Sequence, residues 1–140
     1  MKLNAYLSFD GRCEEALKFY ETALGGKIVM TMTYGQSPMA AQLPPDWGQK
    51  ILHATFALGD QTLGAADNPP GQYLKPQGLW LTLNVDDPAE ADRRFKALAE
   101  KGAVSMPIQE TFWARRFGML VDRFGTPWMI NCVKPEEQRA

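Results

Sequence analysis

The chain has 140 residues, of which 45% are apolar and 22% are charged, and its formal net charge is −1. These values are typical of one soluble globular domain that buries enough surface to form its own core. No run of Lys and Arg is dense enough to neutralise nucleic-acid phosphates, and no apolar stretch is long enough to span a membrane. We therefore expect neither a nucleic acid nor a membrane as a partner.

The cysteines and the first residues indicate a reducing compartment. Cys13 and Cys132 lie far apart and match neither a zinc motif nor a redox CxxC motif. Met1 leads directly into a strand-like pattern, without the apolar core of a signal peptide. We expect a cytoplasmic protein in which both cysteines behave as small buried hydrophobes.

The first half predicts one helix among four strands. Residues 3–9 alternate between apolar and polar side chains, which predicts a strand. Apolar residues at helical spacing predict a helix from about Arg12 to Leu24, ended by Gly25 and Gly26. The further strands are expected at residues 27–34, 51–58 and 61–66.

A long segment, residues 35–49, interrupts the first half. Its three prolines argue against any regular element there. An irregular loop of this length is unusual in a compact domain, and such loops often cover a site or a partner surface.

The second half repeats the order of the first. Residues 68–78 are rich in Pro and Gly and form the plausible joint between two modules, about 1–70 and 78–133, of a single domain. Asp87 followed by Pro88 predicts a helix start, and Gly102 predicts its end. The strands are expected at residues 79–85, 103–109, 117–121 and 128–132. The charged tail, residues 134–140, is expected to fray.

The last two strands are predicted to form a hairpin. Asp122 and Gly125 occupy the first and fourth positions of the connecting segment, which suits a type I turn. The hairpin region carries unusually many polar and aromatic residues for a simple core, so we expect it to form one wall of a cavity. These residues are Trp113, Arg115, Arg116, Asp122, Trp128 and Asn131.

The resulting element order is βαβββ–βαβββ, which predicts an α+β fold. The segment from Leu7 to Gly26 also aligns with the segment from Leu83 to Gly102, which supports an internal repeat. A ferredoxin-like βαββαβ unit is the nearest competitor. That fold has two strands between its helices in sequence, whereas four are predicted here.

Three segments resemble the PhnB-like branch of the vicinal oxygen chelate superfamily, which includes glyoxalase I, extradiol dioxygenases and bleomycin-resistance proteins. The segments are YLSFDGRCEEALKFYETALGG, ILHATFALGDQTLGAAD and FWARRFGMLVDRFGTPWMINC. The resemblance implies the glyoxalase/bleomycin-resistance fold, with two βαβββ modules forming a curled mixed sheet around a cleft, usually in a homodimer. Some PhnB-like proteins carry a methyltransferase label.

The resemblance also locates four expected metal-ligand positions, called here the metal corners. Catalytic members of the superfamily hold a divalent ion with His, Gln or Glu side chains from the first and last strands of each module. The matching positions fall near Asn4, Gly64, Trp80 and Met129, and a register slip would bring in Asn131. None of these is an imidazole or a carboxylate, so we expect no bound metal and no other cofactor.

His53 is the only histidine in the chain. It could act as a general base in the cleft, because the ordinary pKa of histidine lies near neutrality. It could equally be a strand residue paired with a neighbouring carbonyl or with the other subunit.

The candidate ligand-binding residues are aromatic or cationic. Trp80, Trp113 and Trp128 could form an aromatic pocket, or could fill the core or a dimer interface. Arg115 and Arg116 are adjacent, so one of them should point inward. An inward Arg would suit a carboxylate or phosphonate, or could form an ion pair with Asp122 or Glu110.

We favour a metal-independent protein that binds a small organic molecule, anionic or aromatic, as a homodimer. Its contacts would come from Asn4, the three tryptophans and one of the two arginines. One alternative is an isomerase, lyase or dioxygenase of the superfamily, with a non-standard metal site or with His53 as base. A third possibility is a subunit without a small-molecule role, whose cleft is filled by its own side chains.

Overall fold

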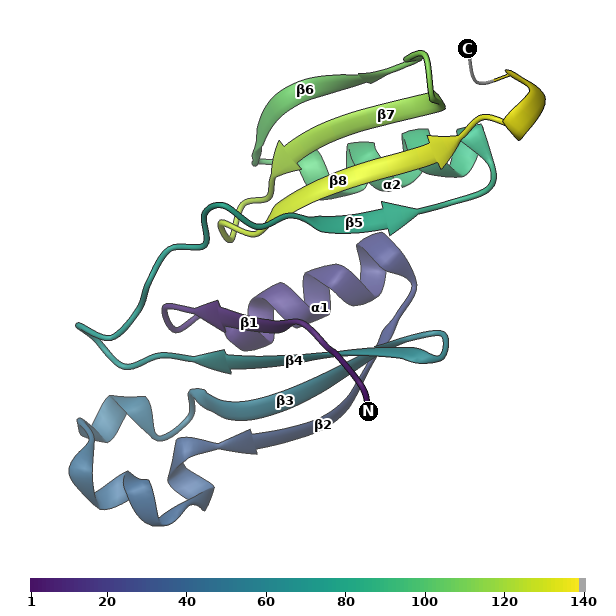
Figure 1. Cartoon of the computed structure of the whole chain (residues 1–140). Coiled ribbons are helices and arrows are strands. Elements are labelled where there is room, and N and C mark those ends of the chain that lie inside the picture. Colours follow the sequence, from purple (N-terminus) through teal and green to yellow (C-terminus); the bar gives the residue numbers. More distant parts are fainter. Residues whose placement is uncertain (139–140) are drawn as a thin grey trace. The chain divides into compact units, whose positions relative to one another are not determined.

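The structure, a computed structural model, describes residues 1–138 (Figure 1). The chain divides into two compact units, Met1–Lys75 and Pro76–Ala140, called here the N-terminal and C-terminal units. In the described residues, each contains one α-helix and a four-stranded mixed sheet in the order βαβββ. The predicted α+β fold of two βαβββ modules is therefore confirmed, and four strands separate the two helices in sequence. Neither sheet closes on itself.

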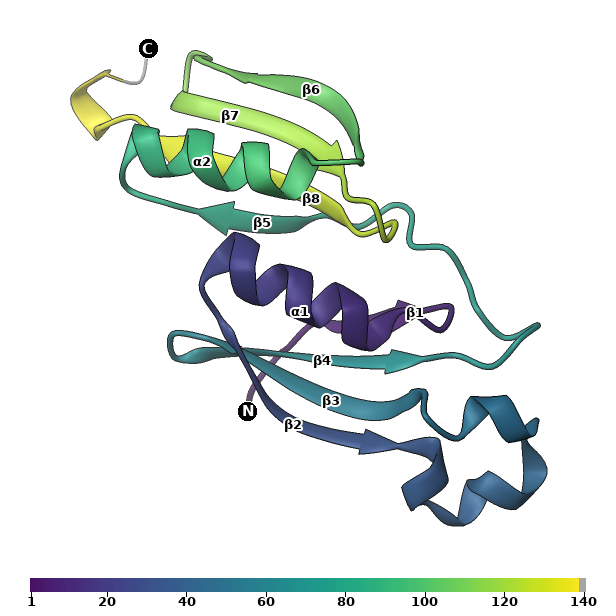
Figure 2. The same cartoon turned by 180° about the vertical axis from the view of Figure 1, so that it is seen from behind.

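In the N-terminal unit the sheet order is β1-β4-β3-β2, with β1 parallel to β4 and the other pairs antiparallel. The helix lies against one face of this sheet (Figures 1 and 2). Its buried stripe includes Leu17 and Tyr20, and the Tyr20 ring meets the Phe56 ring edge-on. The elements are β1 (Tyr6–Phe9), α1 (Cys13–Leu24), β2 (Lys27–Thr33), β3 (Ile51–Leu58) and β4 (Gln61–Asp67).

The C-terminal unit repeats this plan with the sheet order β5-β8-β7-β6. Its helix begins after Asp87, whose carboxylate accepts a hydrogen bond from the backbone N–H of Ala89 at 3.3 Å, as expected for an N-cap. The helix packs on one face of the sheet through Ala91, Phe95 and Leu98 (Figure 2). The elements are β5 (Leu81–Asn84), α2 (Pro88–Ala99), β6 (Ala103–Gln109), β7 (Ala114–Val121) and β8 (Pro127–Val133).

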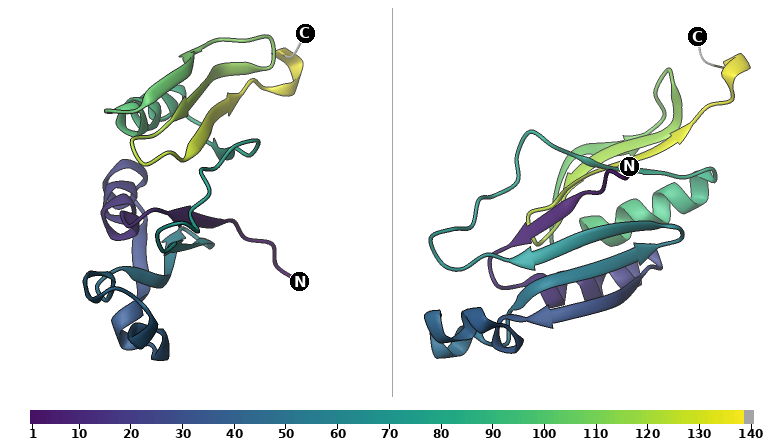
Figure 3. Two further views of the ribbon diagram at one scale, coloured as in Figure 1. Left: turned by 90° about the vertical axis from the view of Figure 1, so that its left-hand side faces the viewer. Right: turned by 60° about the horizontal axis from the view of Figure 1, so that its bottom comes forward.

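The segment between β2 and β3 corrects the prediction of an irregular loop. It contains three short 3-10 helices, Tyr34–Gln36, Pro38–Gln42 and Pro45–Trp47, which lie at one end of the sheet (Figure 3). Pro38 and Pro45 open two of them, because the first turn of a helix does not need the N–H that proline lacks. The prediction that prolines prevent regular structure here was wrong.

Strand ends also differ from the predictions. The first strand begins at Tyr6 and leaves Leu3 fully exposed, whereas β7 begins at Ala114 and is longer than expected. In the predicted fraying tail, Glu136–Gln138 forms a 3-10 helix, and residues 139–140 lie outside the described residues. Among residues 1–138, no helix is long and apolar enough to cross a membrane.

Candidate functional site

Each sheet has one face covered by its helix and an opposite face, here called the open face. In β7 the helix-facing side is identified by Arg116, which contacts Asp92 of α2, and by Gly118, where an added Cβ would meet Phe95 of α2. Because side chains alternate along a strand, Phe117 and Met119 lie on the open face of the C-terminal sheet.

Two rows of side chains cross this open face. In one row, Phe117 of β7 pairs with Asn131 of β8, which pairs with Asn84 of β5. The Asn131 Nδ2 donates to the Asn84 Oδ1 at 3.1 Å. The second row consists of Met106, Met119, Met129 and Thr82. The face therefore combines an amide pair with an aromatic and thioether surface.

Two buried polar atoms in this region lack hydrogen-bond partners among the described residues. They are the Nε of Arg115, a donor, and the Oδ1 of Asn131, an acceptor. Arg115 is anchored at its other end, where Nη2 donates to the backbone carbonyl of Asp86 at 2.8 Å. A buried donor or acceptor left without a partner is energetically costly, so a small movement of either side chain that brought its atom to a complementary group of a bound molecule or water would be favourable.

Trp113 contributes an aromatic edge beside these residues. It precedes β7 and is only partly buried, and its ring meets the Phe117 ring edge-on at a centroid distance of 5.1 Å. On its other side, Phe112 lies 4.8 Å away and is 70% exposed. An aromatic surface thus lies next to the open face at the start of β7.

The two adjacent arginines have different surroundings. Arg116 forms an ion pair with Asp92 at 2.7 Å, and its Nη2 donates to the Ile108 carbonyl at 3.2 Å. Neither arginine forms the predicted ion pair with Asp122 or Glu110 among the described residues. For Arg116 the reason is the register of β7, which directs its side chain toward α2. Arg115 makes no ion pair among the described residues.

Trp128 belongs to the core rather than to the open face. It is 3% exposed, and its Nε1 donates to the Asp122 Oδ2 at 2.9 Å. The structure therefore favours the core-filling interpretation of this tryptophan. Trp80 is partly buried and lies just before β5, not on a strand as predicted.

The open face of the N-terminal sheet carries His53 and Tyr6. The Tyr6 Oη lies 2.9 Å from the His53 Nδ1, and the two rings stack at a centroid distance of 5.6 Å with an interplanar angle of 20°. The hydrogen-bond partner of His53 is thus a tyrosine side chain, not the neighbouring carbonyl that one interpretation expected. Burial, followed by interactions with Cys13 and Tyr34, raises the pKa of the Tyr6 phenol, so it stays protonated at neutral pH.

The metal corners of each unit lack strong metal ligands. Gly64 pairs with Tyr6, and Met129 pairs with Thr82, so these corners supply no imidazole or carboxylate. Asn4, placed near the first corner by the resemblance, instead donates to the backbone carbonyl of Thr62 at 2.9 Å. No cluster of three His, Cys, Asp or Glu side chains occurs within residues 1–138. The donor set does not fit a divalent ion, and the absence of metal stays a prediction.

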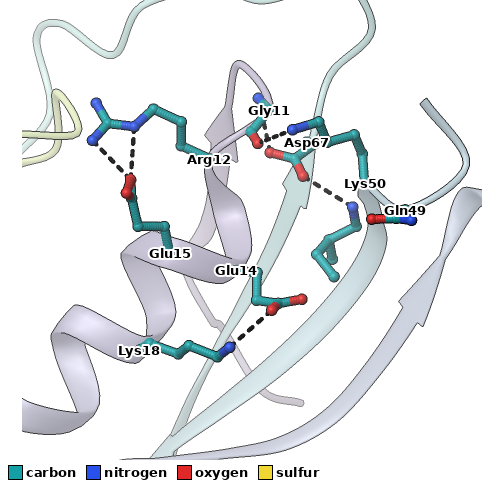
Figure 4. A pocket seen from close by; sticks show the side chains of 9 residues that line it. Gly11, Arg12, Glu14, Glu15, Lys18, Gln49, Lys50 and Asp67 are labelled. Atoms are coloured by element: carbon teal, nitrogen blue, oxygen red, sulfur yellow. Dashed lines mark hydrogen bonds and ion pairs between the residues drawn. The ribbon is translucent and has the colours of Figure 1, made fainter. Parts of the chain in front are cut away.

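Two open cavities also lie in the N-terminal unit. One, of about 520 Å³, contains Asn4 and is lined by residues 2–5 and 60–63. The other, of about 510 Å³, lies at the start of α1 (Figure 4). There Arg12 pairs with Glu15 at 2.8 Å and Lys18 pairs with Glu14 at 2.9 Å, so these side chains bind one another.

The sequence analysis missed Asp67, at the wall of the second cavity. Its buried carboxylate accepts hydrogen bonds from the backbone N–H groups of Gly11, Cys13 and Ile51 at 2.8–2.9 Å. Asp67 thus joins the start of α1 to β3 and β4. Tyr6 and Asn84 were also missed, because their roles depend on strand register, which no local sequence signal reveals.

Comparison with known proteins identifies the family. A family model described as 3-demethylubiquinone-9 3-methyltransferase matches residues 1–131. Protein YjdN of Escherichia coli K12 is 36% identical over 97% of this chain and 98% of its own length.

Several solved structures are similar to this chain, some in both sequence and fold and one in fold alone. Protein PA1353 from Pseudomonas aeruginosa is 45% identical, covers 96% of this chain and 99% of its own, and has a TM-score of 0.86. A Bacillus cereus PhnB protein, described as a putative 3-demethylubiquinone-9 3-methyltransferase, is 27% identical, with coverages of 95% and 100% and a TM-score of 0.81. A glyoxylase/bleomycin resistance protein/dioxygenase domain from Frankia sp., at 13% identity and TM-score 0.67, shares the fold alone. The chain therefore belongs to the PhnB-like family, as the sequence predicted, and it has the glyoxalase/bleomycin-resistance fold.

Proposed function

We propose that this protein binds a small organic molecule on the open face of its C-terminal sheet, without a divalent metal. The observation that carries the proposal is the pair of buried, unpartnered polar atoms, Arg115 Nε and Asn131 Oδ1. A folded chain rarely leaves such atoms without partners, and here they lie in strands whose open face is otherwise aromatic and apolar.

The chemistry of the two atoms defines the ligand class. The Arg115 Nε–H is a charged donor that suits a carboxylate or phosphonate oxygen. The Asn131 Oδ1 accepts a hydrogen bond from a hydroxyl or an N–H group. Phe117 and Met129 offer apolar contact to the body of the ligand. The site therefore suits an aromatic or apolar molecule that carries an acidic group and a hydrogen-bond donor.

The family description supports hydroxylated aromatic compounds as the first probes, because it names a ubiquinone precursor. We choose 4-hydroxybenzoate and phenylphosphonate, which present the two acidic groups on similar rings. The donor set at the corners gives no support to a metal-dependent reaction, so the binding test includes an EDTA-treated sample.

The variants Arg115→Met and Arg116→Met make a matched pair for this test. We expect at least one probe to stabilise the wild-type protein, by about 2.7 kcal/mol at a concentration of 100 Kd. Arg115→Met should lose this stabilisation, whereas Arg116→Met should keep it, because Arg116 contacts α2 on the opposite face. Thermal shift and isothermal titration calorimetry measure both effects.

The proposal fails if neither probe binds, or if Arg115→Met binds as tightly as the wild type. Loss of binding after EDTA treatment, restored by a divalent ion, would contradict the metal-independent part. Mass spectrometric metal analysis of untagged protein should likewise find less than one metal ion per chain.

We also infer that the protein is a homodimer. Support comes from β2, an edge strand whose side chains Val29, Met30 and Met32 are 56%, 41% and 42% exposed. An apolar edge strand of this kind is a ready surface for another chain, because its backbone groups and side chains are both uncovered.

A further inference from the structure

His53 and Tyr6 form a pair that the site on the C-terminal sheet does not use. The imidazole Nδ1 lies 2.9 Å from the Tyr6 hydroxyl, and the two stacked rings lie nearly parallel on the open face of the N-terminal sheet. Tyr6 is 55% exposed, so part of this surface faces solvent.

The absence of a side chain at Gly64 makes this geometry possible. Tyr6 of β1 pairs with Gly64 of β4, and an added Cβ at Gly64 would collide with the Tyr6 ring. The ring therefore lies over the bare backbone of β4 and reaches His53 on β3. Alanine at this position would displace Tyr6 and break the hydrogen bond to His53.

The second imidazole nitrogen remains available. His53 Nε2 makes no hydrogen bond with the described residues, and it is not one of their buried unpartnered atoms, so it is not fully buried. Tyr6 supports either protonation state of the ring, because its hydroxyl can donate to Nδ1 or accept from Nδ1–H. The raised pKa of Tyr6 keeps that hydroxyl neutral.

Few other titratable groups face the pair. The residue paired with His53 on β2 is Met32, and the nearest open-face residues of β4 are Gly64 and Ala66, none of which carries a charge. Tyr6 is the titratable group that faces His53 from β1, and its own electrostatic neighbours are Cys13 and Tyr34. No acidic residue among those described forms an ion pair with His53.

We propose that His53 and Tyr6 form an acid–base pair in a second binding site, which takes a planar aromatic acid. The ligand ring stacks beside the exposed face of Tyr6, against the thioethers of Met30 and Met32. The ligand binds as its anion, and His53 Nε2 takes up one proton from water. The resulting imidazolium donates Nε2–H to the ligand anion and Nδ1–H to the Tyr6 oxygen, so no further reactant is required.

The test uses nuclear magnetic resonance of the imidazole ring with 4-hydroxybenzoate as the probe. His53 is the only histidine, so its ring signals are unambiguous. At a fixed pH near neutrality, we expect the probe to move the ring nitrogen signals toward those of imidazolium. Arg115→Met should leave this change intact, which separates the site from that on the C-terminal sheet.

Two variants complete the experiment. Tyr6→Phe keeps the aromatic ring but removes the hydroxyl, and should change the tautomer signals of free His53 and reduce the response to the probe. His53→Asn should weaken binding at this site by about tenfold, as for loss of one charge-assisted hydrogen bond. Ring signals that ignore the probe, or that respond equally in Tyr6→Phe, would overturn the proposal.

Discussion

At the scale of single residues, two buried carboxylates each organise one unit. Asp122 Oδ1 accepts hydrogen bonds from the backbone N–H groups of Phe124 and Thr126 at 2.8 and 3.1 Å, and its Oδ2 accepts from Trp128 Nε1. The sequence predicted this turn because Asp122 and Gly125 stand close together in the chain. It did not predict the role of Asp67, whose partners lie at the start of α1 and the start of β3, both distant in sequence.

The buried thiol of Cys13 leads to a prediction about how the stability of the protein depends on pH. Burial, followed by the charges of Asp67 and Glu14, raises the pKa of its thiol above the ordinary value of 9.0. Above about pH 9 the unfolded chain therefore loses a proton that the folded chain keeps. The stabilising contribution is complete below that pH and is lost as the pH rises toward the folded pKa.

We expect the free energy of unfolding to fall as the pH rises above about 9, and to fall less steeply in Cys13→Ala. Urea denaturation at a series of pH values measures the slope. The variant also leaves a small cavity, which shifts the whole curve but not its slope. Tyr6 and Tyr34, whose pKa values burial also raises, contribute to the decline that remains, as does Lys18, whose pKa is raised by its hydrogen bond to Glu14. Equal slopes in both proteins would contradict the assignment.

At the scale of elements, the two α-helices were the most predictable parts. α1 and α2 begin and end close to the predicted positions, because apolar periodicity and terminal glycine or Asp-Pro signals act within a few residues. The 3-10 helices between residues 34 and 47 were missed, because they are too short for a periodic pattern.

The packing of α2 on β7 provides a test of element packing. An added Cβ at Gly118 would lie 2.6 Å from Phe95 Cε2 and 2.9 Å from Ile108 Cα. Gly118→Ala should therefore lower the free energy of unfolding by about 1–3 kcal/mol, because backbone and ring must both move. Gly48→Ala is the control, since its Cβ would have no neighbour closer than 3.7 Å. Urea denaturation that ranks the two variants in the opposite order would refute this account.

At the scale of the whole molecule, the repeat predicted from sequence is present in both units. β1 pairs with β4 in the same parallel manner as β5 pairs with β8, and equivalent rows cross the two open faces. Tyr6 and Thr82 occupy matching places in these rows, opposite Gly64 and Met129. The predicted cleft shared by the modules stays a prediction.

The inferred homodimer predicts the molecular mass of the protein in solution. Light scattering coupled to size-exclusion chromatography should give twice the chain mass of 15.7 kDa at micromolar concentration. Val29→Lys places a charge on the exposed edge strand β2 and should shift the protein toward the monomer without unfolding it. A monomeric wild type would exclude the dimer, and an unaffected dimer in Val29→Lys would exclude β2 as its interface.

The sequence by itself determined the element order and the fold class, because helix caps, turns and alternation are local signals. The family was indicated by three segments that resemble PhnB-like proteins. The tertiary structure alone decided which side chains share a face. It placed Arg116 and Trp128 toward the core side while leaving Arg115 and Asn131 with unpartnered atoms, and it set Tyr6 over Gly64. The physical reason is strand register, since a shift of one residue moves every side chain to the opposite face of a sheet.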